Sequence, residues 1–507
     1  MAKGATNKKK RRLLKAFVSF VIAAAAFCLL VYAYEVNSSN SQSYIESEKE
    51  INRFIAIQLD KDPNNLTRED FESLKKLEFD SSVTLSTLKP LQKLTNLETL
   101  ALKGVKKPVV KSPKWLQILR AFLKLSDSQE NPIFNIKPLE KLANLKLLML
   151  EQMGTESIKP LTKLKNLVLL SINLTSVKDI ERLSQLKSLK QLSFSSSVKI
   201  NTHFLRGLDN LETLFISNAQ LLDLEPLTSL KKLKFLNVSF NTKEKVDLEK
   251  FPKLYNLPRL EILLMSADVK SIAFIEEFTG LRNLLLDSNT IEDISPLEQV
   301  TNLERLTLNT KGVKDFKPLS GMKNLKYLDL RMSRINDITP LEHLDLEELD
   351  LSRAEIRNIV PLTNHNNLLK LYLGQTQVSN IDALENLHNL REVDLSQTQV
   401  NDIVPLGHLD NLVSLDLSRT QVRDIQPLAG LANLEYLNIS QTQIMDLSPI
   451  ASLSSLIELN IKGTMISDIK VDEAPENIYK IDLHKRLISE NDISVLKNAL
   501  PRLNIVK

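Results

Sequence analysis

The sequence is poor in the residues on which several common kinds of protein depend. It has a single cysteine, Cys28, so it contains neither an intrachain disulfide nor a zinc site built on cysteines. Its 11 glycines and 5% aromatic residues disfavour a glycine-turned β-sandwich and a collagen-like chain. Hydrophobic residues still make up 43% of the chain. We therefore expect a folded core in which leucine takes the place of aromatic residues.

A basic excess is also missing from most of the chain. Residues 1–15 hold seven of the 66 basic residues and no acid. The remaining 59 basic residues face 62 acidic ones, which gives a net charge of −3. Proteins that bind nucleic acid gain much of their affinity by neutralising phosphates. This balance therefore disfavours a nucleic-acid partner.

The longest run without a charge covers residues 16–34 and contains 19 residues, AFVSFVIAAAAFCLLVYAY. A helix of that length spans about 28 Å, close to the hydrocarbon thickness of a bilayer. The basic residues of the segment 8–15 precede it and acids such as Glu35 follow it. By the positive-inside rule, residues 1–15 form a cytosolic tail and residues 16–34 a transmembrane signal-anchor. The rest of the chain is then periplasmic or extracellular.

Two alternatives for the N-terminus stay open. The sequence Val31-Tyr32-Ala33 fits a small-x-small cleavage site, so the apolar run also agrees with a secretory signal that is removed. The cluster KKKRR at residues 8–12 resembles a nuclear-localisation signal, although it adjoins a segment of membrane length. Cys28 lies inside the apolar run and follows Phe27, which fits a membrane segment better than a lipid-modified cysteine.

A polar linker at residues 35–43 leads to a segment with helical spacing at residues 44–80. Ile45, Ile51, Ile55 and Leu59 recur near helical intervals, and Thr67-x-x-Asp70 has the pattern of a capping box. Two helices here would cover the apolar end of whatever follows. We therefore predict a helical N-terminal cap.

From Leu97 onward the chain repeats a strand-like hexamer with leucine at its first, fourth and sixth positions. It recurs 17 times, most often 22 residues after the previous copy. The intervals from Leu97 to Leu145 and from Leu233 to Leu281 are each 48 residues and indicate irregular segments. We assign residues 81–471 to repeats, with an insertion at about 103–130 and an irregular repeat at about 239–260. Residues 472–507 form the last repeat and a C-terminal cap.

Each hexamer is followed by a polar turn and a second motif, such as NDIVPL at residues 401–406. Proline occupies the same frame in eleven copies and excludes a long helix there. The return half of each coil should therefore be a short 3₁₀ or extended turn. The hexamers should stack as a parallel sheet on the inner side of an arc, which is an α/β solenoid.

These residues resemble the bacterial leucine-rich-repeat proteins typified by the internalins, whose unit is similar to LxxLxxLxLxxNxIxDIxPL. The segment SNTIEDISPL at residues 288–297 matches it almost letter for letter. Thr398, Thr420, Thr442 and Thr464 stand where that family usually has asparagine. The resemblance covers about residues 44–490 and implies a leucine-rich-repeat arc that uses its concave face for protein recognition. A wall-sorting LPxTG motif and an immunoglobulin-like module do not follow the repeats, so a wall-anchored adhesin is not implied.

Side chains alternate along a strand, so the third and fifth residues of a hexamer, and the residue after it, face away from the core. On four consecutive repeats these positions are apolar, and we predict a partner-binding patch there: Phe215, Phe235, Ile262, Leu264 and Leu285. Burial of the patch beneath residues 242–255 is the alternative. Later repeats turn charged and aromatic, and we add four residues of the types favoured at interfaces: Arg305, Tyr327, Arg331 and Tyr372. A plain solvated face is the alternative for these.

The insertion at residues 103–124 carries seven basic residues and no acid. Trp115, Leu119 and Phe122 fall near one helical face, so we predict a basic amphipathic helix that contacts an anionic membrane or a partner. Packing on the convex side is the alternative.

Signals for catalysis are absent from the sequence. It has no glycine-rich GxxxxGK loop and no GxSxG motif. His343, His365, His388 and His408 fall in similar frames of successive repeats, but no carboxylate recurs close to them. We therefore expect no enzyme, metal site or cofactor. The sequence predicts a membrane-anchored protein that binds a protein partner, with a secreted adhesin or a cytosolic scaffold of the phosphatase-regulator type as alternatives.

Overall fold

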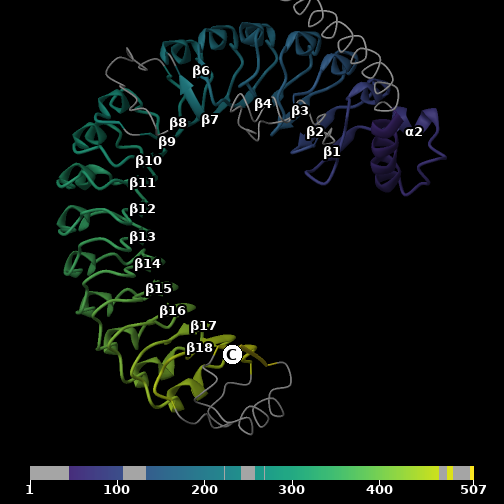
Figure 1. Cartoon of the computed structure of the whole chain (residues 1–507). Helices are drawn as coiled ribbons and strands as arrows, with labels where there is room; N and C mark the ends of the chain where they lie inside the picture. The colour runs from purple at the N-terminus through teal and green to yellow at the C-terminus, as the bar shows by residue number, and fades with distance from the viewer. Residues whose placement is uncertain are drawn as a thin grey trace, which may run out of the picture. The chain divides into compact units, whose positions relative to one another are not determined.

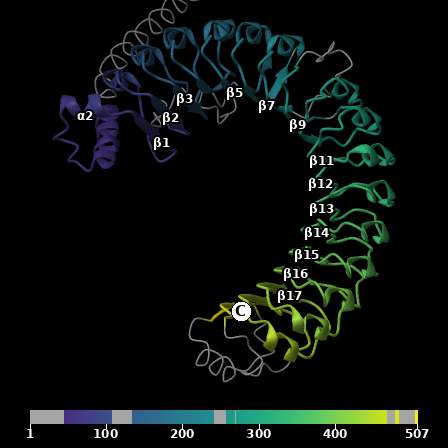
Figure 2. The ribbon, with the colours of Figure 1, turned by 180° about the vertical axis from the view of Figure 1, so that it is seen from behind.

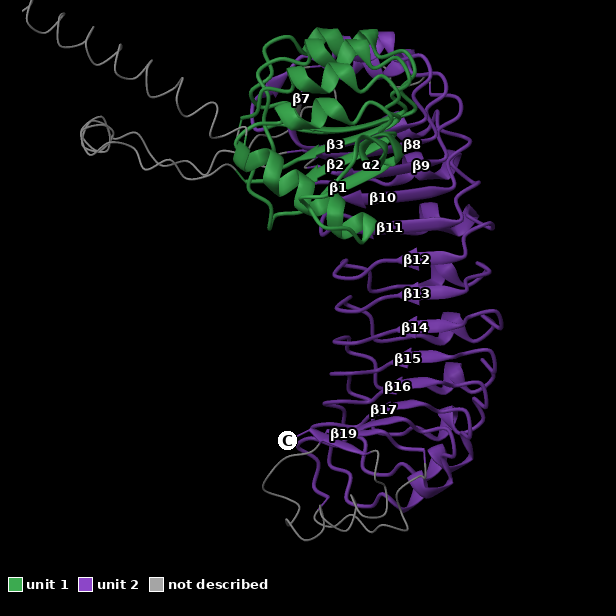
Figure 3. Cartoon of the chain, turned by 90° about the vertical axis from the view of Figure 1, so that its right-hand side faces the viewer, with its two compact units in different colours: residues 1–196 green, residues 197–507 purple. Residues whose placement is uncertain are grey.

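The computed structural model describes residues 45–106, 133–221, 223–240, 257–267, 269–466, 477–482 and 503–506. The chain divides into two compact units, residues 1–196 and 197–507 (Figure 3). Each unit is a series of coils, and each coil contributes one strand and one return turn.

The described part of unit 1 begins with two helices. Residues 45–59 are helical and bury Ile51 and Ile55, whereas Ile45 is 51% exposed although its spacing placed it on the apolar side. The Phe54 ring packs edge-on against Phe79 of the first strand, with centroids 5.1 Å apart. The helix therefore covers the end of the sheet in unit 1.

The second helix, α2 (Arg68–Ser73), starts at the capping box that the sequence contains. The Thr67 hydroxyl accepts from the Asp70 N–H, and the Asp70 carboxylate accepts from the Thr67 N–H at 2.8 Å. The hydrogen bond from Lys61 and that from the Thr67 backbone lower the pKa of Asp70 to about 2. The Asp70 carboxylate is therefore ionised in the folded protein at neutral pH.

The strands of unit 1 pair in parallel, each with the next along the chain. They are β1 (Lys76–Phe79), β2 (Thr99–Lys103), β3 (Leu147–Glu151), β4 (Leu169–Asn173) and β5 (Gln191–Ser195). Lys103, which the sequence placed in the insertion, is the last residue of β2. The return turns are 3₁₀ helices: η1 (Lys89–Lys93), η2 (Lys137–Lys141), η3 (Lys159–Lys163) and η4 (Ile180–Gln185).

Unit 2 has the same construction and is longer. After β6 (Lys199–Ile200), its parallel ladder runs without a break in pairing from β7 to β20. The strands are β7 (Thr213–Leu221), β8 (Phe235–Phe240), β9 (Ile262–Ser266), β10 (Asn283–Asp287), β11 (Arg305–Asn309), β12 (Tyr327–Asp329), β13 (Glu348–Asp350), β14 (Lys370–Tyr372), β15 (Glu392–Asp394), β16 (Ser414–Asp416), β17 (Tyr436–Asn438), β18 (Glu458–Asn460), β19 (Lys480–Asp482) and β20 (Asn504–Val506).

The return turns of unit 2 lie on the side opposite its sheet (Figures 1 and 2). They are η5 (His203–Gly207), η6 (Glu225–Ser229), η8 (Ala273–Ile275), η9 (Ser295–Gln299), η10 (Lys317–Gly321), η11 (Thr339–Leu341), η12 (Val360–Leu362), η13 (Asp382–Leu384), η14 (Val404–Leu406), η15 (Gln426–Gly430) and η16 (Ser448–Ser452). In most of them proline takes one of the first two positions, where its missing N–H costs no hydrogen bond. The predicted solenoid with a parallel sheet and 3₁₀ turns is confirmed.

Side chains of the turns hold each coil closed. An aspartate or asparagine two residues before the turn accepts an N–H at its start, as Asp402 does from Val404 at 2.9 Å. An asparagine before the hexamer donates to a carbonyl of the previous coil, as Asn411 does to His388 at 2.8 Å. Each turn therefore satisfies backbone groups that its few residues cannot satisfy alone.

The threonines that stand where the resembling family has asparagine form hydrogen bonds within their own coils. The buried Thr398 hydroxyl donates to the carbonyl of Leu395 in its own coil at 2.6 Å. The same bond recurs at four other positions: Thr376, Thr420, Thr442 and Thr464. This closes the bend after each strand from within one coil.

Candidate functional site

The sheet of unit 2 has one face in the core and one open face. On β9, Leu263 and Met265 are buried, while Ile262, Leu264 and Ser266 between them are half-buried. The same alternation on the neighbouring strands creates columns of side chains that cross the open face at one residue per strand. A ligand on this face contacts those columns.

The five apolar residues predicted from the sequence lie together on four neighbouring strands, and we call them the apolar patch. The register pairs Phe235 of β8 with Ile262 of β9, and pairs Leu264 of β9 with Leu285 of β10. The Phe215 and Phe235 rings are in contact, with centroids 4.9 Å apart and planes tilted by 41°. All five side chains are half-buried. The patch is thus an apolar area on the open face, in which the register places the polar Asn237 between Phe215 and Leu264.

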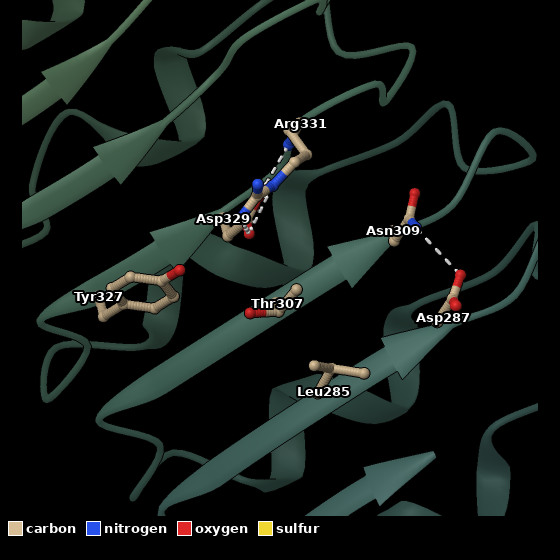
Figure 4. Close-up of a pocket in the computed structure, with 7 residues that line it drawn as sticks. All are labelled: Leu285, Asp287, Thr307, Asn309, Tyr327, Asp329 and Arg331. Carbon is tan, nitrogen blue, oxygen red and sulfur yellow. Dashed lines mark hydrogen bonds and ion pairs between the residues drawn. The ribbon is translucent and has the colours of Figure 1, made fainter. Parts of the chain in front are cut away.

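A hollow of about 370 Å³ adjoins the patch on β10, β11 and β12 (Figure 4). Leu285 of β10 and Thr307 of β11 are register partners in its lining, and Tyr327 stands beside them. Around them the polar groups are paired: the Asn309 amide donates to Asp287 at 3.0 Å, and the Arg331 guanidinium donates to Asp329 at 2.9 Å. The Arg305 guanidinium lies 3.9 Å from the centroid of the Tyr327 ring.

Burial of Asp329 holds one partner of the Arg331–Asp329 ion pair in place. The Asp329 side chain is only 2% exposed, whereas that of Arg331 is 52% exposed and also lies 3.6 Å from Asp350. The hydrogen bond to Asp329 raises the pKa of Arg331, so its charge is permanent. Burial, followed by the nearby charges of Asp329 and Glu348, raises the pKa of Tyr327 and keeps its hydroxyl protonated. These groups are held in position before any partner binds.

Tyr372 lies two strands beyond this hollow, on β14. Its hydroxyl donates to Glu392 at 2.6 Å, and Lys370 pairs with the same carboxylate at 2.8 Å. Burial, and then the bond to Glu392, raises the pKa of Tyr372. The nine predicted partner-binding residues, from Phe215 to Tyr372, therefore all lie on the open face of unit 2, and their role in binding stays a prediction.

The sequence matches one family model. That model is described as Leucine Rich repeats (2 copies) and matches residues 388–430, within the regular coils of unit 2. The chain is a leucine-rich-repeat protein. None of the curated proteins matches its sequence.

Several solved structures resemble this leucine-rich-repeat protein. The internalin InlF of Listeria monocytogenes is 23% identical over 81% of this chain and 94% of its own, with a TM-score of 0.43. Internalin C2 of the same organism is 30% identical over 39% of this chain and 88% of its own, with a TM-score of 0.35. TLR13, in a complex with ssRNA13, is 20% identical over 82% and 75%, with a TM-score of 0.51. The last of these likenesses shows the fold alone.

Two groups of predicted contacts in this leucine-rich-repeat protein fall outside the described residues. They are the segment 16–34 and the three apolar residues of the insertion, Trp115, Leu119 and Phe122. Among the residues that the structure does describe, none of the helices has the length and apolar character needed to cross a membrane. The transmembrane segment and the amphipathic helix stay predictions. The segment 242–255, which was the alternative cover for the apolar patch, also lies outside these residues.

A row of left-handed residues was not anticipated from the sequence. Six non-glycine residues on consecutive coils have φ between 55° and 62°: Met332, Arg353, Gln375, Gln397, Arg419 and Gln441. Each N–H donates to a carbonyl of the next coil, as Arg353 does to Gly374 at 2.8 Å. Asparagine and glycine signal this conformation in a sequence, whereas arginine and glutamine do not. All six side chains are exposed along one edge of the open face.

The four histidines do not form a site. His343, His388 and His408 are exposed, and His365 is buried. Over the described part of the chain, no group of three or more histidine, cysteine or acidic residues is arranged to hold a metal ion.

Proposed function

We propose that this leucine-rich-repeat protein is a binding scaffold that recognises a protein partner through the open face of unit 2. The observation that carries the proposal is the apolar patch, in which two phenylalanines and three aliphatic residues stay half-buried on a face that carries polar side chains elsewhere. Such patches rimmed by fixed polar groups mark interfaces, and the adjoining Arg and Tyr side chains belong to the types that dominate binding energy.

A protein suits this face better than a nucleic acid does. TLR13 has been solved with an RNA, but acids outnumber bases in this chain beyond residue 15, and acidic side chains follow the patch on β12, β13, β15 and β16. A phosphate backbone would be repelled there. Polypeptide side chains, by contrast, can cover the apolar patch and pair with the charged groups of the adjoining hollow.

The test replaces Phe215, Phe235 and Leu264 together with serine. Hot-spot truncations cost about 2 kcal/mol or more each, so the variant should lose at least about 30-fold in partner affinity. The matched control replaces three exposed hydrophobic residues outside the sheet, Val360, Val404 and Met445, with serine. Circular dichroism and urea unfolding confirm that both variants fold. Unchanged partner binding by the folded patch variant contradicts the proposal.

We also propose that the repeats are exported and held at the membrane by residues 16–34. The length of the uncharged run and the basic cluster before it support this placement. The test is membrane fractionation with protease protection, using a C-terminal tag on intact cells and spheroplasts. Integral protein whose tag is digested only after the outer layers are opened supports anchoring. Soluble, shortened protein in the medium supports the cleaved signal at residues 31–33 and a secreted binder instead.

A further inference from the structure

One column of the open face is acidic and contains a fixed aromatic ring. It runs through Asp350, Tyr372, Asp394 and Asp416, which the register pairs one after another on β13, β14, β15 and β16. Neighbouring strands lie about 4.8 Å apart, so the Tyr372 ring has a carboxylate on each side. We call these four residues the acidic column.

A hollow of about 350 Å³ lies beside this column and is lined by Asp350, Asp394 and the small residues Ser352, Gly374 and Ser396. Gly374 is a buried residue of its lining. A Cβ atom at Gly374 would lie 2.7 Å from a carboxylate oxygen of Asp394, so the absence of a side chain lets that carboxylate pack against the backbone. The hollow therefore gives a ligand access to two carboxylates of the acidic column, those of Asp350 and Asp394.

Arg331 and Lys370 are engaged by other carboxylates than Asp394 and Asp416. Arg331 is bound to Asp329 and also lies 3.6 Å from Asp350. Lys370 pairs with Glu392, which also accepts from the Tyr372 hydroxyl. Between described residues, no ion pair reaches Asp394 or Asp416. These carboxylates accept from neutral groups instead: Asp394 from the Ser396 N–H, and Asp416 from the Ser418 N–H and the Asn438 amide, each at 2.8 Å.

The carboxylates of the column also repel one another. Burial is the main reason that the pKa of Asp394 is raised, and the charges of Asp416 and Asp350 raise it further. A cation placed among them would relieve both effects. An aromatic face attracts the same kind of ligand, because its quadrupole is negative.

We propose that the partner segment that covers the apolar patch also carries an arginine or lysine whose side chain binds over Tyr372 between Asp350 and Asp394. The proposal rests on the proposed function and specifies the chemistry of the partner. Leu264 on β9 and Tyr372 on β14 are five strands apart, roughly 24 Å, which an extended chain covers with about seven residues. The partner segment should therefore be amphiphilic, with an apolar cluster and a basic residue at that separation.

Two arginines line the hollow, Arg331 and Arg353, and the second allows a substitution that should change binding in the opposite direction. Arg353 lines the same hollow from its left-handed position, where Gln375, Gln397 and Gln441 stand in other coils. Arg353→Gln is therefore accommodated by the backbone and removes a positive charge near the acids. It should strengthen the binding of a cationic side chain.

The experiment selects random 16-residue peptides, displayed on phage, against the full chain held in nanodiscs of neutral phosphatidylcholine. Wild type is compared with Asp394→Asn/Asp416→Asn and with Asp402→Asn/Asp424→Asn, which removes two acids from the turns. The control keeps its turns closed, because Asn358 and Asn380 cap the same turns in other coils. A third protein carries the three serine substitutions in the apolar patch.

We expect wild type and the turn control to select peptides that combine apolar residues with arginine or lysine, and the column variant to lose the basic enrichment. Compared with wild type, a selected peptide should bind the column variant at least about tenfold more weakly. It should bind the Arg353→Gln variant a few-fold more tightly. Both differences in affinity should become smaller at high salt. Peptides without basic enrichment, or equal enrichment on the column variant, overturn this inference. Peptides bound undiminished by the patch variant overturn the proposed function instead.

Discussion

A buried histidine in the return turn of one coil should make unit 2 sensitive to acid. His365 is 3% exposed and stands where the adjacent coils have Leu344 and Leu387, with the same backbone bonds at that position. Its Nε2 lies 3.1 Å from the Leu341 carbonyl, so Nε2 carries the proton. Its Nδ1 is buried without a hydrogen-bond partner. The pKa of His365 is lowered, mainly by burial.

The direction of the effect follows from this lowered pKa. The unfolded chain takes up a proton at its ordinary pKa of about 6.5, while the folded chain resists protonation. Stability is therefore full above that pH and falls as the pH drops toward the folded pKa. Between pH 7.5 and 5.5 the loss is at most about 1.4 kcal/mol, a limit that the ordinary pKa of the unfolded histidine sets.

The perturbation is His365→Leu. It removes an unsatisfied buried nitrogen, and the Leu341 carbonyl keeps its bond from the Leu344 N–H, so we expect stabilisation of about 1 kcal/mol at pH 7.5. The gain should be larger at pH 5.5, with an upper limit of about 2.4 kcal/mol. Urea unfolding, together with hydrogen exchange of the coil around residues 362–368, measures both values. His343→Leu, an exposed histidine one coil earlier, is the control. An equal gain at both pH values would refute the reasoning.

Three further predictions concern the coils and the open face. Asp402→Ala removes the acceptor for the Val404 N–H and should destabilise its coil by about 1 kcal/mol, whereas Asp402→Asn should be nearly neutral; local hydrogen exchange distinguishes them. Thr398→Val deletes the buried hydroxyl bond to Leu395 and should cost about 1 kcal/mol in urea unfolding, with no change meaning that the bend closes without it. Arg305→Ala removes the cation over Tyr327 and should weaken partner binding by about 0.5–1 kcal/mol without altering unfolding, so an equal loss of stability would assign Arg305 to the fold.

The regular part of the fold could be predicted from the sequence because it follows from a period. Leucines at fixed intervals determine which side of each strand is buried, and proline in a fixed frame excludes a long return helix. The same alternation predicted that Phe235 and Leu264 lie on the open face, since the side of a strand depends only on the parity of the position.

Other features depend on contacts between coils and could not be predicted from the period. Nothing in the letters of one repeat indicates that Tyr372 binds Glu392 of the next coil, because either side chain can also turn toward solvent. His365 was considered only as a metal ligand, although its frame is a leucine position in the adjacent coils. The positive φ of Arg353 and Gln375 is imposed by hydrogen bonds to the next coil rather than favoured by the residue types.

The most direct test of protein recognition by the open face is site-specific photo-crosslinking in cells that produce the full chain. A p-benzoylphenylalanine is introduced separately at Phe235 and Leu264 in the apolar patch, and at Val360 and Val404, which are 63% and 61% exposed on the return turns. The account predicts that one discrete protein adduct forms from both patch positions and from neither turn position. Adducts from the turn positions alone, or the same adducts from all four positions, would contradict it.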